Sequence, residues 1–373
     1  MRALRYRARV RVGENAVFNC HHQGFYMLRL LRRIALPLLL ARGVALGQAR
    51  ARPADSHHAS DVPLALTHVT VIDATGSPAQ PDMTVIISGG RITALGPPPA
   101  KVAVPAGAHV VDATGKFLIP GLWDMHIHID DAEFYAGNKR YATYPSQRDK
   151  EAVFHLLIAN GVTGVRDMSG GAEVVASFSG QKCAALFDRF KRNGTWLCPT
   201  LHNTWRHVHD ADSSLTTDKR ARFFPPAFRQ FWAAKAGDAR RRTPQFVAQW
   251  DRYYSAVRVM IPNVRRAGVG LLAGSDAGAN EYSVPGFSLH DELLELVDAG
   301  LTPMEALQTA TMNPARYLGM TDALGTVELG KIADLFLLDA NPLDDIRNTQ
   351  RISAVVVNGS MLDKPELQQI LAG

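Results

Sequence analysis

An apolar run that ends in two histidines constrains this chain more than any other feature. Phe117–Met125 is apolar apart from one aspartate, and His126-Ile127-His128 follows it directly. Side chains of a strand alternate between its two faces, so the imidazoles of His126 and His128 point the same way. Two imidazoles on one face of a strand end can bind one divalent metal ion. The alternative is a pair of histidines at a polar strand end without a ligand.

Both ends of the chain's body are rich in short strand-like runs. Turn residues such as Gly89-Gly90 separate the early runs, and Asn358-Gly359 between two later runs is a strong two-residue hairpin signal. A second hairpin is expected across Gly330-Lys331. The pattern predicts one small β-sandwich built from residues 63–116 and 325–365. The runs are Ala65–Ile72, Thr84–Ile87, Arg91–Leu95, His109–Val111, Gly325–Leu329, Ala333–Leu338, Ala354–Val357 and Ser360–Leu362.

The middle, residues 117–324, alternates strands with helices, which predicts a parallel sheet. Helical spacing covers Arg148–Asn160 and Gln245–Ala267, and Thr302–Glu305 combines an N-cap, a proline in the first turn and a capping-box glutamate. The long polar stretch Asn203–Arg242 reads as an insertion. Histidines and an aspartate at strand ends suggest the mouth of a barrel.

The front end, residues 1–49, differs from the rest. Residues 1–50 carry ten arginines and one acidic residue, so the formal charge of +6 leaves the body at about −3 and gives no case for nucleic-acid binding. Residues 27–49 combine a charged start, a short apolar core and small residues, which is typical of a signal peptide. The sequence thus predicts export to the periplasm or beyond. After cleavage Cys183 and Cys198 remain, and two free thiols are favoured over one disulfide.

Several motifs together resemble the amidohydrolase superfamily, in its imidazolonepropionase-like and Xaa-Pro-dipeptidase-like branch. The resemblance implies a metal-bearing (β/α)8 barrel with a β-sandwich made from both chain ends. It also implies two histidines on strand 1, a bridging lysine on strand 4, histidines on strands 5 and 6, and an aspartate on strand 8. The motifs are Gly121–His128, Gly161–Met168, Leu272–Gly278, Leu301–Leu307 and Gly330–Leu335.

This chain departs from that pattern in the middle of the barrel. Trp196–Thr200 resembles strand 7, and about 29 residues separate it from Asp167 at the end of strand 2. A barrel uses roughly 30 residues per strand–helix unit, so strands 3–6 cannot fit there. The expected fold is a truncated TIM-type α/β barrel whose strands 7, 8, 1 and 2 form a parallel half with two open edges and an apolar concave face. Such edges predict closure by a second chain or a poorly folded product. A third alternative is that the deletion itself is an error in the gene sequence.

The resemblance assigns His126, His128 and Asp276 as ligands of a divalent metal, with zinc expected. Asp276 is also the catalytic base; its alternative is a helix N-cap. Arg166 at the end of strand 2 is a candidate for binding a substrate carboxylate or for a salt bridge, and His290 is a second candidate near the mouth. His207 and His209 form another two-histidine motif, but it lies in the polar insertion and reads as surface.

Two functions remain open. One is metal-dependent hydrolysis of C–N bonds in a small amide, cyclic amide or dipeptide through a metal-activated water. The other is a degenerate, non-catalytic amidohydrolase fragment with at most a binding or structural role. The number of metal ligands distinguishes them, since an active site from one chain needs a third or fourth donor near His126, His128 and Asp276.

Overall fold

The computed structural model describes residues 62–97, 102–128, 147–167, 187–209, 218–223, 226, 229–230, 232–233, 243–277 and 283–372. All of them belong to one compact unit. The predicted signal peptide and Cys183 lie outside the described residues. Within the described ranges, none of the helices combines the length and apolarity needed to span a bilayer.

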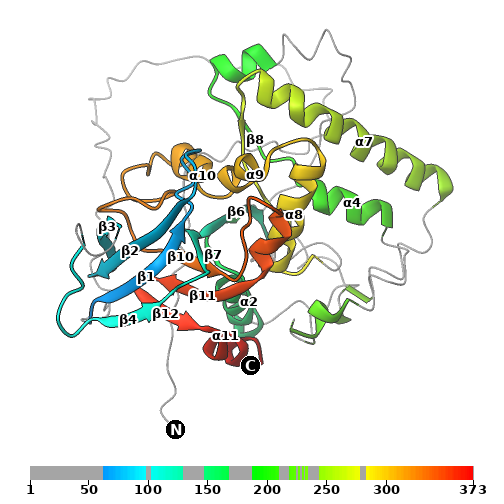
Figure 1. The fold of residues 1–373 in the computed structure, drawn as a ribbon. Coiled ribbons are helices and arrows are strands. Elements are labelled where there is room, and N and C mark those ends of the chain that lie inside the picture. Colours follow the sequence, from blue (N-terminus) through cyan, green and yellow to red (C-terminus); the bar gives the residue numbers. More distant parts are fainter. Residues whose placement is uncertain are drawn as a thin grey trace, which may run out of the picture. The chain divides into compact units, whose positions relative to one another are not determined.

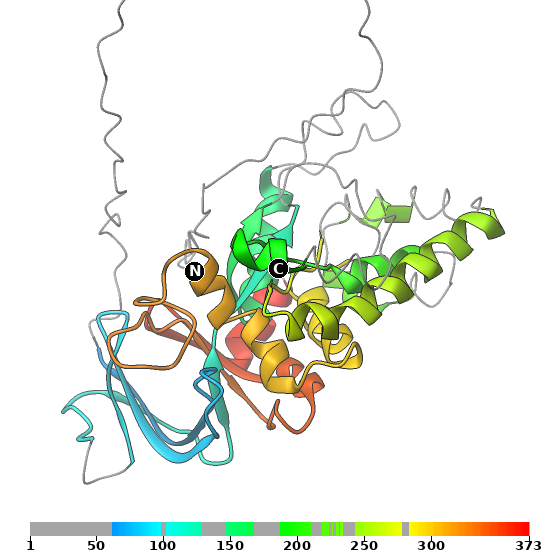
Figure 2. The ribbon, with the colours of Figure 1, turned by 90° about the horizontal axis from the view of Figure 1, so that it is seen from above.

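Strands from both chain ends form one eight-stranded sheet (Figures 1 and 2). The order is β12-β11-β10-β5-β1-β2-β3, and β4 pairs with β1. The two ends join where Leu118 of β5 faces Leu337 of β10. Strands from both predicted segments therefore pair within one sheet. The strands are β1 Leu64–Val71, β2 Gln80–Ser88, β3 Arg91–Gly96, β4 His109–Asp112, β5 Phe117–Pro120, β10 Leu335–Leu338, β11 Ile352–Val357 and β12 Ser360–Asp363.

One of the two predicted hairpins forms. β11 and β12 pair antiparallel across Asn358-Gly359, and both turn residues have positive φ, 51° and 78°, as a type I′ turn requires. The hairpin across Gly330-Lys331 was predicted wrongly. Those residues instead bond the backbone of Ile92 in β3, and β10 lies between β5 and β11, because the buried run Leu335–Leu338 is apolar on both faces and suits a central strand.

Four short parallel strands carry the candidate site. β6 (Leu122–Ile127) pairs in parallel with β7 (Val162–Asp167), and β8 (Trp196–Leu197) pairs in parallel with β9 (Gly270–Leu271). The segment after β9 then lies parallel to β6, since Ile127 and Ala277 form a bridge and Met125 N–H donates to Ala273 O at 2.9 Å. The order β8-β9-β6-β7 is the one expected for strands 7, 8, 1 and 2 of a barrel.

Helices pack around these strands. Thr302 and Glu305 form the expected capping box of α9, and Thr243 caps α7. The start of the supposed polar insertion is also helical, because α4 begins at Leu201. The helices are α2 Gln147–Ala159, α4 Leu201–His209, α7 Pro244–Arg266, α8 Phe287–Asp298, α9 Pro303–Thr309, α10 Met312–Tyr317 and α11 Lys364–Ala372, with 3₁₀ turns η2 Lys219–Phe223 and η3 Ile346–Gln350.

The apolar side of the parallel strands is covered in the described part of the chain. Trp123, Met125 and Leu272 are buried, and they pack with Ala315 of α10 and with Leu324 further on. The expected exposed apolar surface is therefore not found at these residues. Burial of this cluster supplies hydrophobic stabilisation below the ends of β6 and β9.

Candidate metal centre

His126 lies near the end of β6, His128 directly follows that strand, and Asp276 follows β9 on the neighbouring segment. Two backbone hydrogen bonds connect these ends: Asp276 N–H donates to His126 O at 2.6 Å, and His128 N–H donates to Ala277 O at 2.8 Å. Because neighbouring parallel strands end at the same edge of a sheet, the two histidines and the aspartate lie close together at that edge. Sequence positions far apart are thus brought together by strand pairing.

Asp276 has an unusual backbone. Its φ is +53°, in the left-handed region that few residues other than glycine adopt and where aspartate is among the better tolerated. Such strain is found at sites where the surrounding structure enforces it. Here the hydrogen bond from Asp276 N–H to His126 O holds the backbone in this conformation.

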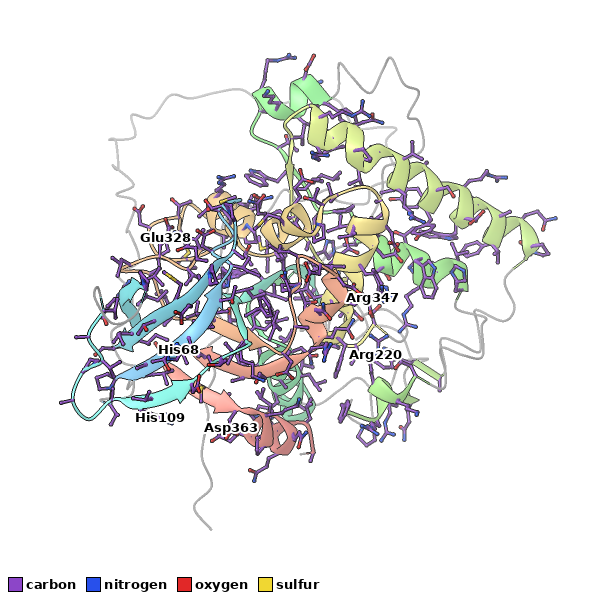
Figure 3. All side chains as sticks on the ribbon, viewed as in Figure 1. His68, His109, Arg220, Glu328, Arg347 and Asp363 are labelled. Carbon is purple, nitrogen blue, oxygen red and sulfur yellow. The ribbon has the colours of Figure 1, made fainter. Side chains whose placement is uncertain are left out.

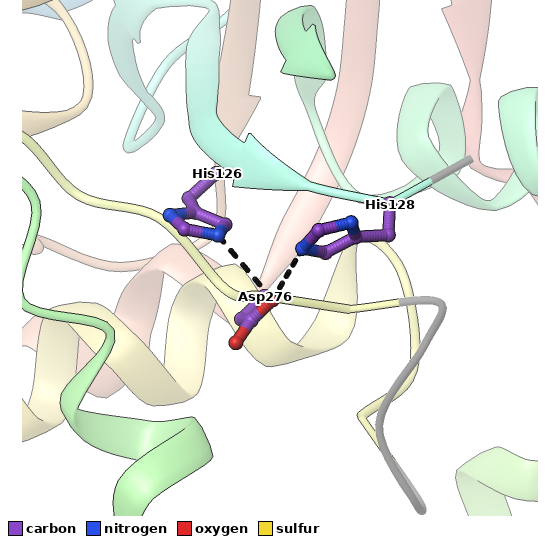
Figure 4. A group of neighbouring side chains, drawn as sticks. All are labelled: His126, His128 and Asp276. Atoms are coloured by element: carbon purple, nitrogen blue, oxygen red, sulfur yellow. Dashed lines mark ion pairs between the residues drawn. The ribbon is translucent and has the colours of Figure 1, made fainter. Parts of the chain in front are cut away.

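The three side chains point toward one another (Figure 4). Asp276 Oδ1 lies 2.9 Å from His128 Nε2 and 3.4 Å from His126 Nε2. One ligand atom from each residue lies within 4.8 Å of the others. Tetrahedral zinc with bonds of about 2.0–2.1 Å separates its ligand atoms by roughly 3.3 Å. The nitrogen and oxygen donors and their spacing therefore fit one divalent ion.

Asp124 fixes the two strands beneath this cluster. It is fully buried, and it accepts hydrogen bonds from the N–H of Ser275 at 2.9 Å, from the hydroxyl of the same residue, and from the N–H of His126 at 3.2 Å. Burial raises the pKa of Asp124 to about 6, against the lowering effect of these donors. The Asp124 carboxyl group thus binds His126, a candidate ligand, and Ser275, which precedes the candidate ligand Asp276.

Helix α4 supplies a further side chain to the cluster. Asn203 Nδ2 donates to Asp276 Oδ2 at 2.6 Å. The first turn of α4 is itself bound to α8, because His202 N–H donates to Glu292 Oε2 at 2.8 Å. Both Asn203 and Glu292 are buried. Neither residue carries a signal in the sequence, since one lay in a supposed insertion and the other within an ordinary amphipathic helix.

Burial changes the titration of the groups around α4. It raises the pKa of Glu292 to about 8, although backbone N–H donors from His202 and Leu201 oppose the shift. Burial also lowers the pKa of His202 to about 4, against the nearby charge of Asp291. Arg220, labelled in Figure 3, bridges Asp291 and Asp218 at 2.7 and 2.8 Å. The segment 218–223 is thereby attached to α8.

The other predicted site residues lie in different surroundings. Arg166 Nε donates to Met125 O at 2.8 Å, and its Nη1 donates to the hydroxyl of Tyr317 at 3.0 Å. These contacts hold the guanidinium beside β6. No salt bridge of Arg166 with an acidic residue occurs among the described residues.

The structure does not bring His290 to the cluster. Its Nδ1 lies 3.0 Å from Thr349 Oγ1 and its Nε2 lies 3.0 Å from Asn160 O. The ring is buried with both nitrogens engaged, and burial lowers its pKa to about 4. This geometry is that of a neutral packing histidine that joins α8 to η3 and to the residue that follows α2.

The second two-histidine motif also lies apart from the first. His207 and His209 project from α4, where the ring of His207 lies against Trp250 and that of His209 stacks on Trp205. Within the described ranges, the one group of metal-ligating side chains that converges is His126, His128 and Asp276.

Comparison with known proteins agrees with the motifs. Residues 238–362 match the amidohydrolase family. The chain is 24% identical to an adenine deaminase of Paracoccus denitrificans over 308 aligned positions, which cover 69% of this chain and 51% of the relative. It is 23% identical to an imidazolonepropionase of Thermoplasma acidophilum, covering 70% of this chain and 84% of the relative. The chain spans about half the length of the adenine deaminases it matches.

Solved structures share the fold. A Xaa-Pro dipeptidase with bound methionine matches with a TM-score of 0.55 and 16% identity, over 81% of this chain and 100% of the other. A bottromycin amidohydrolase matches with a TM-score of 0.57 and 18% identity, over 83% and 88%. Residues 238–362 thus match the amidohydrolase family, and the chain shares its α/β fold with these solved TIM-barrel structures.

Proposed function

We propose that this chain is a metal-dependent hydrolase that cleaves C–N bonds of small molecules, using one divalent ion held by His126, His128 and Asp276. The observation that carries the proposal is the convergence of two imidazole nitrogens and one carboxylate oxygen at the ends of β6 and β9. Three protein ligands with an open fourth position are the usual arrangement of catalytic zinc.

The described residues supply groups for metal binding and for proton transfer. Asp276 Oδ1 and the Nε2 atoms of His126 and His128 would hold a divalent ion. When bound, such an ion would supply Lewis-acid chemistry, acidifying a water and polarising a substrate carbonyl. Asp276 Oδ2 accepts a hydrogen bond from Asn203. A carboxylate oxygen can accept more than one such bond, so Oδ2 can also take the proton of the attacking water and pass it to the leaving nitrogen.

The substrate class follows from the relatives by name. Matched proteins include adenine deaminases, an imidazolonepropionase and a Xaa-Pro dipeptidase, whose names describe small molecules with a C–N bond. We infer a small amide, cyclic amide or dipeptide as the substrate here. Arg166 remains the proposed contact for a substrate carboxylate, and Arg166→Leu should raise KM for acidic or peptide substrates much more than for neutral amides.

We further propose that the barrel is shortened between strands 2 and 7. The spacing of β7 and β8 supports this, and so does one alignment. The match to the imidazolonepropionase runs over 349 positions while using 70% of this 373-residue chain, which is about 261 residues. About 88 positions of the alignment therefore have no counterpart here. A family member shortened in this way lacks the bridging lysine and two further histidines.

Two other proposals concern the chain's context. In the described residues, β7 pairs with β6 alone, and β8 pairs with β9 alone. We therefore propose self-association through the outer edges of β7 and β8. Sedimentation of the purified chain tests it, and a compact monomer contradicts it. We also propose export, which N-terminal sequencing of the mature protein tests; an intact residue 27–49 segment contradicts it.

Turnover in the presence of metal tests the function. The full chain loaded with Zn²⁺ or Co²⁺ is incubated with dipeptides, cyclic amides and aminopurines, and ammonia or amine release is measured beside the His128→Ala variant. We expect release by the unaltered chain and none by the variant. Equal release by both contradicts the metal mechanism, and tight metal binding without release from any substrate supports the degenerate, non-catalytic alternative.

A further inference from the structure

We propose that Asn203 is a positioning residue that fixes the Asp276 carboxylate so that its Oδ1 faces both imidazoles. This inference rests on the proposed metal centre and adds a residue from α4 to it. A carboxylate on a strand end can rotate about its side-chain bonds, and a metal ligand performs best when a second group holds it in the binding orientation.

Asn203 contacts the Asp276 carboxylate directly. Asn203 Nδ2 lies 2.6 Å from Asp276 Oδ2, while Oδ1 of the same carboxylate lies 2.9 and 3.4 Å from the two imidazole nitrogens. An ionised carboxylate only accepts hydrogen bonds, so the amide atom that faces it must be the nitrogen. The two oxygens therefore differ in role, because Oδ2 is held by Asn203 and Oδ1 points to the histidines.

The anchoring of α4 carries the second step. Glu292 of α8 accepts the N–H of His202 at 2.8 Å, one of the N–H groups in the first helical turn that lack a partner within the helix. Thr200, just before α4, has φ +45°, which is strained for a β-branched residue. Asp276 across the contact is strained in the same sense. Left-handed backbone at Asp276 and in the residue before α4 is the kind of strain that persists where the surrounding structure enforces it, often at functional sites.

Unsatisfied polar atoms carry the third step. Asn203 Oδ1 and Glu292 Oε1 are buried without a hydrogen-bond partner in the described part of the chain. A buried acceptor without a partner costs about 1–3 kcal/mol. An apolar residue at position 203 would avoid that cost, so an asparagine there is better explained by its bond to Asp276 than by packing.

Cobalt binding tests the inference. The full chain, stripped of metal, is titrated with Co²⁺ against a chelating indicator, and the visible spectrum of the bound ion is recorded. The variants are Asn203→Leu, which keeps the size of the side chain, and Asn203→Ala, which fits in any space the asparagine leaves. We expect binding roughly 10–100-fold weaker in both, with an altered spectrum. Thermal unfolding without metal reports whether each variant is folded.

Thr204→Val is the matched control, because Thr204 lies next to Asn203 on α4 and its hydroxyl bonds Thr200 O rather than Asp276. It should bind Co²⁺ as the unaltered chain does. Unchanged Co²⁺ affinity and spectrum in a folded Asn203 variant overturn the inference but not the metal centre. The same holds if Thr204→Val weakens Co²⁺ binding as much as the Asn203 variants do. The proposed metal centre itself fails if the unaltered chain binds no Co²⁺. It fails as well if His128→Ala binds Co²⁺ as the unaltered chain does.

Discussion

Replacing Glu292 by glutamine should remove a large part of the pH dependence of stability between pH 5 and 8. The carboxyl group is fully buried in α8, and burial raises its pKa from an ordinary value of 4.5 to about 8. In the unfolded chain the same group is ionised above pH 5. The folded state therefore holds a proton that the unfolded state has lost.

The sign and size follow from proton linkage. Where the folded state binds more protons, stability falls as pH rises, by about 1.4 kcal/mol for each pH unit per group. This loss begins near pH 4.5 and ends near pH 8, where the folded state also ionises. Between pH 5 and 7 the unaltered chain should lose roughly 3 kcal/mol relative to Glu292→Gln, since glutamine does not titrate.

Urea unfolding of both proteins at several pH values measures this difference. Asp112→Asn is the control, because hydrogen bonds from Thr114 lower the pKa of Asp112, so that this exposed carboxyl is ionised in both states across the whole range. The difference in the free energy of unfolding between the unaltered chain and Glu292→Gln should change with pH. The corresponding difference for Asp112→Asn should be independent of pH. A flat difference for Glu292→Gln would refute a neutral, buried glutamate behind α4.

Other substitutions have equally definite outcomes. Gly274→Ala would put a Cβ atom 2.5 Å from that of His126 and 2.8 Å from its backbone nitrogen, so it should destabilise the fold by about 1–3 kcal/mol and weaken Co²⁺ binding; unchanged binding contradicts this packing. Gly359→Ala should cost about 1 kcal/mol or more in urea unfolding because φ is +78°, and an unaltered midpoint contradicts the turn. His290→Gln should lessen the loss of stability on acidification from pH 6.5 to 4, because the folded His290 stays neutral to about pH 4 while the unfolded one takes up a proton; equal acid sensitivity of variant and unaltered chain contradicts this burial.

The parts of the fold set by local pattern were predictable. The two-residue period of β6 placed both histidines together, Asn358-Gly359 indicated the β11–β12 hairpin, and the order of the motifs indicated the order of the parallel strands. The Gly330-Lys331 hairpin failed because a glycine turn signal does not state which strands it joins. Leu335–Leu338 is apolar on both faces, and its pairing with β5 depends on contacts distant in sequence.

The partners of the site residues were not predictable. Asn203 and Glu292 act through a helix start and a buried carboxyl group, and neither has a spacing that marks it in the sequence. His290 was a candidate near the mouth, yet its ring lies within hydrogen-bonding distance of Asn160 and Thr349. Burial and side-chain direction decide these roles, and both arise from tertiary packing.

Metal content measures the central claim most directly. The full chain, equilibrated with Zn²⁺ and freed of excess, is analysed for bound metal beside His126→Ala, His128→Ala and Asp276→Ala. Convergence of these three side chains on one ion predicts about one zinc per chain in the unaltered protein and loss of it in each variant. Two tightly bound ions per chain, or one ion that survives all three substitutions, would contradict the account.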